Sequence, residues 1–338
     1  MAEPDDIREL LTGGCLQPLF QPIVSPLDNH ILGFEGLIRG RQPGTAAIIP
    51  PDRLFAQTAD EDFIIALDAA CRATILREYG RLYRHNREIS LFINIHQATI
   101  LRGGNILTLF KEVHRWGLHP ENIAIELDES AISDTRILER FIEEQRRHGF
   151  CIAFDDFGNG SFSLPRIAIF RPDYVKIDIS IIRNIHRNAD AREKFVSFSR
   201  SAAENGGIII AEGVETEDEA REIARLGGDL IQGFYFLHPM ELHTIDQQER
   251  RRIHKICRRL GKTKLVSSLN NLITTTDRRR LDILICPACG RLLEVSAEHE
   301  WNDYIRTGTL NCAHCQEVFP IVSGIPIMRV PDRSYPGR

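Results

Sequence analysis

Short apolar runs alternate with longer amphipathic segments between about residue 15 and residue 240 of this 338-residue chain. The runs resemble buried strands in length and composition, and the segments between them have helical periodicity. Strands that alternate with helices form βαβ units and a mainly parallel sheet, which predicts an α/β fold. About eight strands fit a (β/α)8 barrel, and an open doubly wound sheet is the alternative. The runs are LFQPIV, ILGFEGLI, LFINI, IAIEL, CIAF, YVKI, IIIA and DLIQGFYF.

Length and charge limit the class of protein. The chain is long enough for one large domain and a small one, and its 42 basic and 47 acidic residues exclude both a polycation and a disordered acidic chain. The N-terminal sequence lacks the basic and apolar regions of a secretory signal. No apolar run reaches the roughly 18 residues that span a bilayer. We therefore expect a soluble, cytoplasmic protein that has no membrane partner.

Composition changes twice along the chain, and these changes set the expected domain boundaries. Residues 1–245 carry the alternation of strands and helices, residues 246–280 are rich in Lys and Arg, and residues 281–330 carry paired cysteines. We expect a barrel, a basic helical linker and a small zinc ribbon, in that order. The basic segment is either a solvated helical face or an arm that packs on the barrel.

Polar side chains occur near the C-terminal ends of almost all the expected strands. In a parallel barrel these ends meet at one face, where barrel active sites lie. Any one of these residues alone would read as a helix cap, a turn residue or a surface charge, so the prediction depends on their repetition at equivalent positions. They are Glu35, Asn94, Glu126, Asp155, Asp156, Lys176, Glu212 and Gln232.

The chemistry of this set indicates a site for hard cations. Carboxylate and amide oxygens suit Mg²⁺ or Mn²⁺. The adjacent Asp155 and Asp156 would repel each other if both were charged and buried, and cations would offset that repulsion. Two metal ions about 3.5–4 Å apart are a common device for phosphodiester hydrolysis. We therefore expect one or two ions at this face of the barrel.

The motifs resemble those of EAL domains, a family of bacterial cyclic di-GMP phosphodiesterases. FQPIV, GFEGLIR, FINIH, IELDES, FDDFGNG, YVKID, AEGVE and QGFYF occur in the family's order over about residues 10–240. The resemblance implies a modified (β/α)8 barrel that hydrolyses cyclic di-GMP to linear pGpG with Mg²⁺ or Mn²⁺. It also implies a homodimer formed through the barrel.

The same resemblance implies the residues that bind metal and perform catalysis. One metal is held by Glu35, Asn94, Glu126 and Asp155. Asp155 bridges to a second metal, which Asp156 and Glu212 help to bind. Lys176 orients the attacking water, so the expected catalytic residues are Lys176, Glu212, Asp155 and Asp156.

Five further positions carry implied roles around this centre. Gln21 and Arg39 match positions that contact the nucleotide, and a guanidinium suits a phosphate. Gln232 completes the site through a water or the substrate. Glu215 supports the metal ligands from behind, and Glu129 braces the loop that follows Asp156.

Three features depart from the family pattern. Gly36 replaces the usual Ala of the signature triplet, and Asp128 stands where Thr is preferred. The loop after Asp156 reads GNGSFS, residues 158–163, in place of a Tyr-Ser-Ser run. In the family this loop couples dimerisation to catalysis. The alternative function is therefore a cyclic di-GMP receptor that does not hydrolyse its ligand and signals to a partner through the C-terminal region.

Two C-x-x-C pairs near the C-terminus indicate a zinc site. They are Cys286 with Cys289 and Cys312 with Cys315, and 22 residues lie between the pairs. Four thiolates suit one structural, tetrahedral Zn²⁺, and a redox dithiol is the alternative. The surrounding sequence resembles a small ribbon family whose members activate tRNA and other methyltransferases, which implies a protein partner. If the ribbon rather than the barrel determines the function, the protein is instead an interaction protein for a methyltransferase or a nucleic-acid machine.

Overall fold

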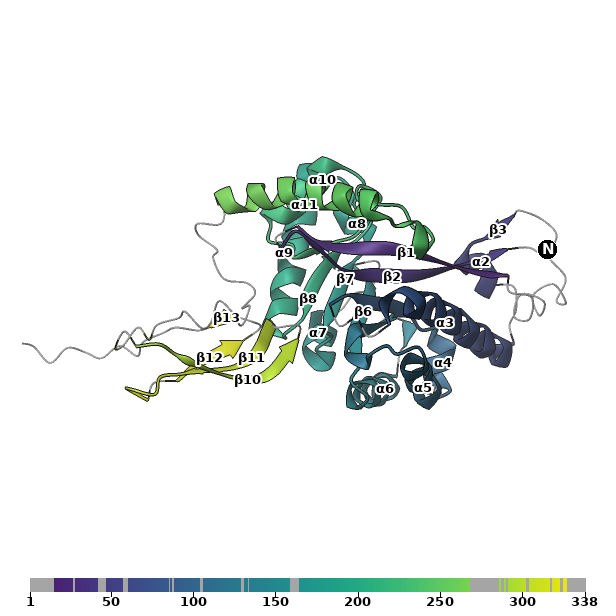
Figure 1. Ribbon diagram of the computed structural model, residues 1–338, viewed down its shortest axis with the longest axis horizontal. Helices are drawn as coiled ribbons and strands as arrows, with labels where there is room; N and C mark the ends of the chain where they lie inside the picture. The colour runs from purple at the N-terminus through teal and green to yellow at the C-terminus, as the bar shows by residue number, and fades with distance from the viewer. Residues whose placement is uncertain are drawn as a thin grey trace, which may run out of the picture.

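The computed structural model describes a barrel with its helices and a separate four-stranded sheet (Figure 1). The loop residues 159–163, Glu129 and the segment 268–280, for which sequence expectations were stated above, lie outside the described residues. The described residues are 15–26, 28–41, 47–56, 60–84, 86, 88–103, 106–128, 131–132, 134–158, 164–267, 286, 289, 291–301, 304–316, 318–322 and 325–326.

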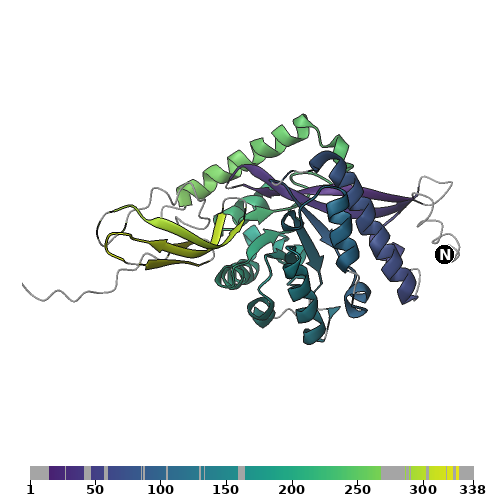
Figure 2. The same cartoon turned by 60° about the horizontal axis from the view of Figure 1, so that its bottom comes forward.

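Eight strands close into a ring through their pairings. Helices lie around these strands (Figure 2). Hydrogen-bonded neighbours follow the order β1–β9–β8–β7–β6–β5–β4–β2, and β1 also pairs with β2. The predicted barrel is confirmed, because the pairing of β1 with both β2 and β9 excludes an open sheet. The strands are β1 (Leu16–Ser25), β2 (His30–Arg41), β4 (Ser90–Asn94), β5 (Ile123–Leu127), β6 (Cys151–Phe157), β7 (Tyr174–Ile177), β8 (Ile208–Ala211) and β9 (Leu230–Ile231), with β3 (Ile48–Ile49) added to the edge of β2.

The direction of β1 distinguishes this barrel from an all-parallel one. β1 runs antiparallel to both β2 and β9, whereas the other neighbouring barrel strands are parallel. A short hairpin therefore joins the first two strands, and helices join the later ones. The antiparallel direction places the beginning of β1 beside the end of β2, and near the middle of both strands Gln21 pairs with Glu35.

Helices between the strands begin at side-chain caps that the sequence supplies. Asp60 caps α3 and Asp134 caps α6, and Thr216 with Glu219 forms a capping box at α10. The helices are α2 (Pro51–Phe55), α3 (Glu61–Tyr83), α4 (Gln97–Leu101), α5 (Ile106–Arg115), α6 (Thr135–Arg147), α7 (Leu164–Phe170), α8 (Ile179–Ile182), α9 (Ala189–Glu204), α10 (Glu217–Arg225) and α11 (Gln247–Ser267), with short 3₁₀ turns η1 (Pro120–Asn122), η3 (Ile185–Arg187) and η4 (Leu242–Thr244).

An apolar layer fills the half of the barrel that lies away from its mouth. Each of the eight strands contributes one buried side chain to it: Ile23, Leu32, Phe92, Ala124, Ala153, Tyr174, Ile210 and Leu230. Residues two apart on a strand point to the same side. The next inward-pointing position toward the mouth of the barrel therefore lies two residues away on each strand. Most of these positions carry polar residues.

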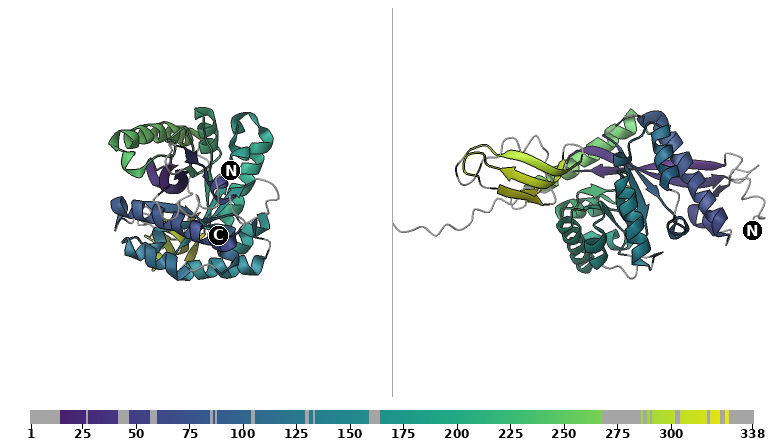
Figure 3. Two further views of the ribbon diagram at one scale, coloured as in Figure 1. Left: turned by 90° about the vertical axis from the view of Figure 1, so that its right-hand side faces the viewer. Right: turned by 90° about the horizontal axis from the view of Figure 1, so that it is seen from below.

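Helix α11 packs along the outside of the barrel (Figures 1 and 3). Its apolar residues Ile253, Ile256 and Leu260 are buried in the main core, which lies between the barrel strands and the helices. His254 Nδ1 lies 2.7 Å from the carbonyl oxygen of Asn29, at the turn between β1 and β2. The helical part of the expected basic linker thus contacts the barrel, while the division at residues 245 and 280 stays a prediction.

The second part of the fold is an antiparallel sheet. Its order is β10 (Glu294–Trp301), β11 (Tyr304–Asn311), β12 (Val318–Val322) and β13 (Ile325–Pro326). Its core contains Leu293, Leu310 and Phe319 together with the paired cysteines. Among the described helices of the whole chain, none has the length and apolar content needed to cross a membrane.

Candidate active site

A polar layer lies directly above the apolar layer of the barrel. On six strands the polar residue comes two positions after the residue of the apolar layer. On the antiparallel β1 the polar residue comes two positions before it. This spacing is the two-residue period of a β-strand, so the strands themselves bring the predicted residues together. The layer consists of Gln21, Asn94, Glu126, Asp155, Lys176, Glu212 and Gln232, with Glu35 added from β2.

The adjacent aspartates occupy a bulge in β6. Phe154 pairs with Val175 and Phe157 with Ile177, so Asp155 and Asp156 together lie opposite the single residue Lys176. Asp156 has a φ of +53°, a left-handed conformation that a non-glycine residue adopts at a cost. Its backbone N–H donates to Asp155 Oδ1 at 3.0 Å. The bulge explains how two neighbouring carboxylates serve the same site, since regular alternation would point them to opposite faces.

Lys176 is the centre of the polar layer. Its side chain is 1% exposed, and Nζ lies 2.6 Å from Glu126, 2.8 Å from Glu212 and 3.0 Å from Asp155. Glu35 is the fourth neighbouring carboxylate, at 3.6 Å. Burial lowers the pKa of Lys176, but the surrounding carboxylates outweigh burial and raise that pKa well above its usual range. Lys176 therefore remains protonated at neutral pH.

One lysine does not balance the carboxylates around it. Burial, followed by Glu35, raises the pKa of the fully buried Glu126 well above its usual range. Burial also raises the pKa of Glu212. Burial and then Asp155 raise the pKa of Asp156 to about 6. Together with Glu35, these groups place five carboxylates against one lysine, and this excess of hard oxygen donors fits divalent cations such as Mg²⁺ or Mn²⁺.

Amide side chains complete the layer. Asn94 Nδ2 donates to Glu126 at 2.9 Å and to Glu35 at 3.3 Å. Gln232 Nε2 donates to Gln21 Oε1 at 3.0 Å and to Glu35. The buried Gln232 Oε1 has no hydrogen-bond partner among the described residues. That oxygen is therefore available to a water, a ligand or a substrate group.

Three oxygen ligands lie close enough together to share one ion. One carboxylate oxygen each from Asp155, Asp156 and Glu212 falls within a mutual distance of 4.8 Å.

Of the other predicted residues, Arg39 lies on β2, on the same side of the strand as Glu35 and four residues further toward the mouth. Glu215 forms a two-bond ion pair with Arg183, at 2.5 and 2.9 Å, outside the polar layer.

A cavity of about 470 Å³ opens beside the polar layer. It extends from Glu35 and Asp155 past α3 and α4, and its wall includes a buried ion pair between Asp68 and Arg72. Asp68 also accepts hydrogen bonds from Thr99 Oγ1 at 2.6 Å and from the backbone N–H of His96 at 3.2 Å. Sequence reasoning missed these residues. The available signal was an Asp and an Arg four residues apart on the apolar face of a helix.

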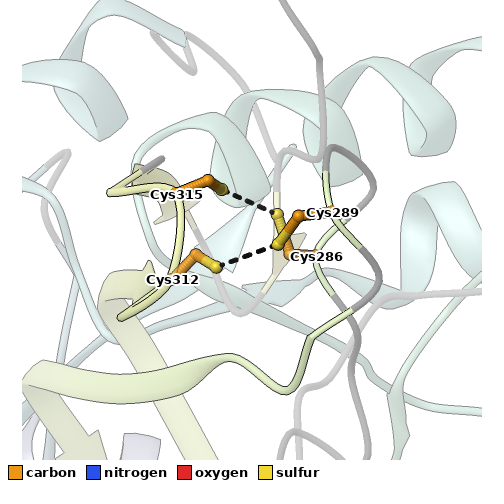
Figure 4. Close-up of side chains that lie close together, drawn as sticks. All are labelled: Cys286, Cys289, Cys312 and Cys315. Carbon is orange, nitrogen blue, oxygen red and sulfur yellow. Dashed lines mark hydrogen bonds between the residues drawn. The ribbon is translucent and has the colours of Figure 1, made fainter.

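The four predicted cysteines converge at one end of the small sheet (Figure 4). Cys286 and Cys315 have their Sγ atoms 3.5 Å apart, and Cys289 and Cys312 have theirs 3.4 Å apart. All four Sγ atoms lie within 4.8 Å of one another. A tetrahedral Zn²⁺ with Zn–S bonds of about 2.3 Å requires S–S separations of about 3.8 Å. The cluster therefore fits one zinc ion, and the separations are too long for disulfides.

Backbone donors stabilise the thiolate form of Cys312 in this cluster. The backbone N–H of Cys315, and then that of His314, lower the pKa of Cys312 to about 6 against the effect of burial. Thiolates are the form of cysteine that binds metals. Among the described residues, the apolar core beside the cysteines is small, so a metal is an appropriate source of stability for this sheet.

The fold and the polar layer define a class of protein, a β/α barrel whose mouth presents oxygen ligands for divalent cations. Residues 5–239 match the family model for the EAL domain. This match covers more than half of the chain, so the chain belongs to the EAL domain family.

Individual relatives are similar over the barrel. The probable cyclic di-GMP phosphodiesterase PdeI of Escherichia coli K12 is 31% identical over 252 residues, which cover 72% of this chain and 31% of PdeI. The chain thus spans about a third of that relative's length. BlrP1 of Klebsiella pneumoniae, solved with calcium and cyclic di-GMP, is 29% identical, with a TM-score of 0.62 over 71% of this chain and 58% of BlrP1. A standalone EAL protein from Vibrio cholerae O395, solved with c-di-GMP, is 28% identical, with a TM-score of 0.59 over 67% of this chain and 92% of that one.

Proposed function

We propose that this chain hydrolyses cyclic di-GMP to linear pGpG with one or two divalent cations, Mg²⁺ or Mn²⁺, at the mouth of the barrel. The observation that carries the proposal is the cluster of Glu35, Glu126, Asp155 and Glu212 around the buried Lys176. Similarity to PdeI supports the reaction. Similarity to BlrP1, which was solved with cyclic di-GMP in both calcium and manganese complexes, supports the substrate and the metals.

The polar layer would divide its ligands between two ions. Glu35, Asn94, Glu126 and Asp155 would hold one, and Asp155, Asp156 and Glu212 would hold the other. When bound, such ions neutralise phosphate charge and lower the pKa of a coordinated water. Gln21 and Gln232 lie at the closing strands of the barrel and would contact the substrate, as would Arg39 at the rim, where a guanidinium suits a phosphate.

Lys176 acts in this scheme as a fixed cation. Because it stays protonated, it cannot accept the proton of the attacking water, and its Nζ donors orient that water instead. Glu212, which lies 2.8 Å from Lys176, would accept this proton. The water oxygen bonds to phosphorus as the P–O3′ bond breaks. The departing 3′ oxygen then takes a proton from solvent and leaves a 5′ phosphate on linear pGpG.

The decisive experiment combines turnover with binding. Purified full-length protein is incubated with cyclic di-GMP and Mg²⁺, Mn²⁺ or Ca²⁺, and the products are separated by chromatography and identified by mass. We expect pGpG with Mg²⁺ or Mn²⁺ and a loss of turnover in Asp155→Asn. A matched control is Asp190→Asn, which removes a carboxylate from an exposed ion pair on α9 and should leave turnover unchanged.

A binding measurement separates the enzyme from a receptor. Calorimetry with cyclic di-GMP and Ca²⁺ reports binding whether or not the protein turns the ligand over. Binding without turnover under any metal would overturn the enzymatic proposal and favour a receptor that signals through its C-terminal part. If the protein neither binds cyclic di-GMP nor turns it over, cyclic di-GMP is excluded as its ligand.

We also propose that the cysteine cluster holds one structural Zn²⁺ and that the small sheet binds a protein partner. The fit of four Sγ atoms to a tetrahedron supports the metal. Thiolates at such a site suit a reducing compartment, which supports action in the cytoplasm. Elemental analysis of dialysed protein tests the zinc, and co-purification with residues 281–330 tests the partner.

Light scattering on the full chain tests the homodimer that we propose forms through the barrel.

A further inference from the structure

A second cleft lies beside the loops that follow β8 and β9, and its lining shares no residue with the polar layer. It has a volume of about 450 Å³ and is formed between α11 and the turn that follows β9. We call it the α11 cleft. The family match ends at residue 239, so one wall belongs to the family domain and the other to the helix beyond it. The lining residues that matter here are Glu215, Phe234, Tyr235, Arg252, Lys255 and Arg259.

The helical wall of the cleft is cationic. Arg252, Lys255 and Arg259 are three and four residues apart, so they form one stripe on α11 beside the buried apolar stripe. All three are exposed, and Arg252 lies 3.6 Å from Glu249. The acidic residue in the cleft, Glu215, is already bound by Arg183. Glu217, outside the lining, interacts with Arg259 and Tyr235. The lining itself holds three cations and one carboxylate, so the cleft presents a net positive surface to a ligand.

The opposite wall is aromatic and held in place. Phe234 is 47% exposed, and its ring packs on His238 with centroids 4.1 Å apart. The backbone N–H of Tyr235 donates to Val214 O at 3.0 Å, and the N–H of Val214 donates to Gln232 O at 3.1 Å. An aromatic face on a fixed backbone costs little further ordering when a ligand binds.

We propose that the α11 cleft binds a nucleoside monophosphate, with the base on Phe234 and the phosphate against Lys255 and Arg252. A flat aromatic face opposite a row of cations matches the two chemical parts of a nucleotide, a stacking base and an anionic phosphate. The volume of the cleft is that of a small-molecule site. None of the lining residues belongs to the polar layer, so the proposed site does not depend on the proposed hydrolysis.

Calorimetry on the full-length protein without added divalent cation tests the proposal, with 5′-GMP, 5′-AMP and inorganic phosphate as probes. We expect both nucleotides to bind, more weakly at higher salt, and more tightly than phosphate alone. Lys255→Glu and Phe234→Ala should each weaken binding about tenfold or more. Arg258→Glu is the matched control, because it makes the same charge change on an exposed position of α11 outside the cleft.

Three results would overturn the proposal. The first is equal binding of phosphate and the nucleotides, because the base would then make no contact. The second is binding that disappears in Arg39→Ala but persists in Lys255→Glu, which would place the nucleotide at the barrel mouth. The third is the absence of nucleotide binding to the unaltered protein. Circular dichroism of Lys255→Glu confirms that the variant is folded, so that a loss of affinity reports on the cleft.

Discussion

Restoring the family's usual alanine at residue 36 should destabilise this protein. A Cβ atom on Gly36 would lie 2.4 Å from Ile75 Cγ2 on α3, whereas ordinary contacts of this kind begin at 3.4 Å. The helix and β2 would have to separate by about 1 Å, or Ile75 would have to leave its rotamer. Overpacking of a buried site costs about 1–3 kcal/mol. In a domain of this size we therefore expect Gly36→Ala to lower the Tm by about 2–12 °C.

A double-mutant cycle tests this reasoning. Ile75→Ala removes the three side-chain carbons, Cγ2, Cδ1 and Cγ1, that the new methyl would meet. Alone it should cost about 2–5 kcal/mol by leaving a cavity. In the double variant the new methyl group at residue 36 enters the space that Ile75 vacated. The cost of the double variant should then fall below the sum of the single costs by more than about 1 kcal/mol. Urea unfolding followed by circular dichroism gives these free energies.

Two outcomes would refute the packing argument. One is a Gly36→Ala variant as stable as the unaltered protein, which would mean that β2 and α3 adjust without cost. The other is strict additivity in the cycle, which would mean that residues 36 and 75 do not compete for space. A confirmed coupling would show that the signature glycine and the isoleucine of α3 are matched to each other.

Three further predictions concern the metal sites. Lys176→Met should lower kcat by about a hundredfold or more with little change in KM, as steady-state kinetics can show; a change confined to KM would assign Lys176 to substrate binding. Since the pKa of Asp156 is raised to about 6, Mn²⁺ affinity measured by calorimetry should rise with pH through about 6, because protons and metal compete for the carboxylate; a flat profile from about pH 5 to pH 7 contradicts this. Cys286→Ser with Cys289→Ser should release zinc, measured by elemental analysis, and leave short-term barrel activity largely intact, because the described cysteine cluster shares no core with the barrel; unchanged zinc content would be inconsistent with the ribbon site.

The barrel and most of its mouth were predictable because both follow from local periodicities. Strands and helices alternate visibly in the sequence, and parallel strands bring their C-terminal ends together, so Glu126, Asp155 and Lys176 could be expected in one place. The spacing of the cysteine pairs predicted their convergence in the same way. The chemical roles of these residues remain predictions, because geometry alone does not measure turnover.

Other features depend on long-range packing that no local pattern encodes. The bulge at Asp155 and Asp156 is a matter of hydrogen-bond register between β6 and β7. The packing of α11 was obscured because basic residues dominate its composition, although Ile253, Ile256 and Leu260 recur at helical spacing. The contact between Gly36 and Ile75 joins residues 39 positions apart on different elements. The fold is needed to show that the size of residue 36 is limited by Ile75.

The two layers inside the barrel account for the unusual electrostatics of its mouth. The apolar layer beneath closes the barrel, so that buried carboxylates above it face water only from one side. Burial, and after it the neighbouring carboxylates, raise the pKa values of Glu126, Asp156 and Glu212, so without cations these groups bind protons more readily. Divalent cations and protons therefore compete for the same oxygens. Because Lys176 already occupies the middle of the layer, a cation would have to bind at the outer oxygens, on the side open to a substrate phosphate.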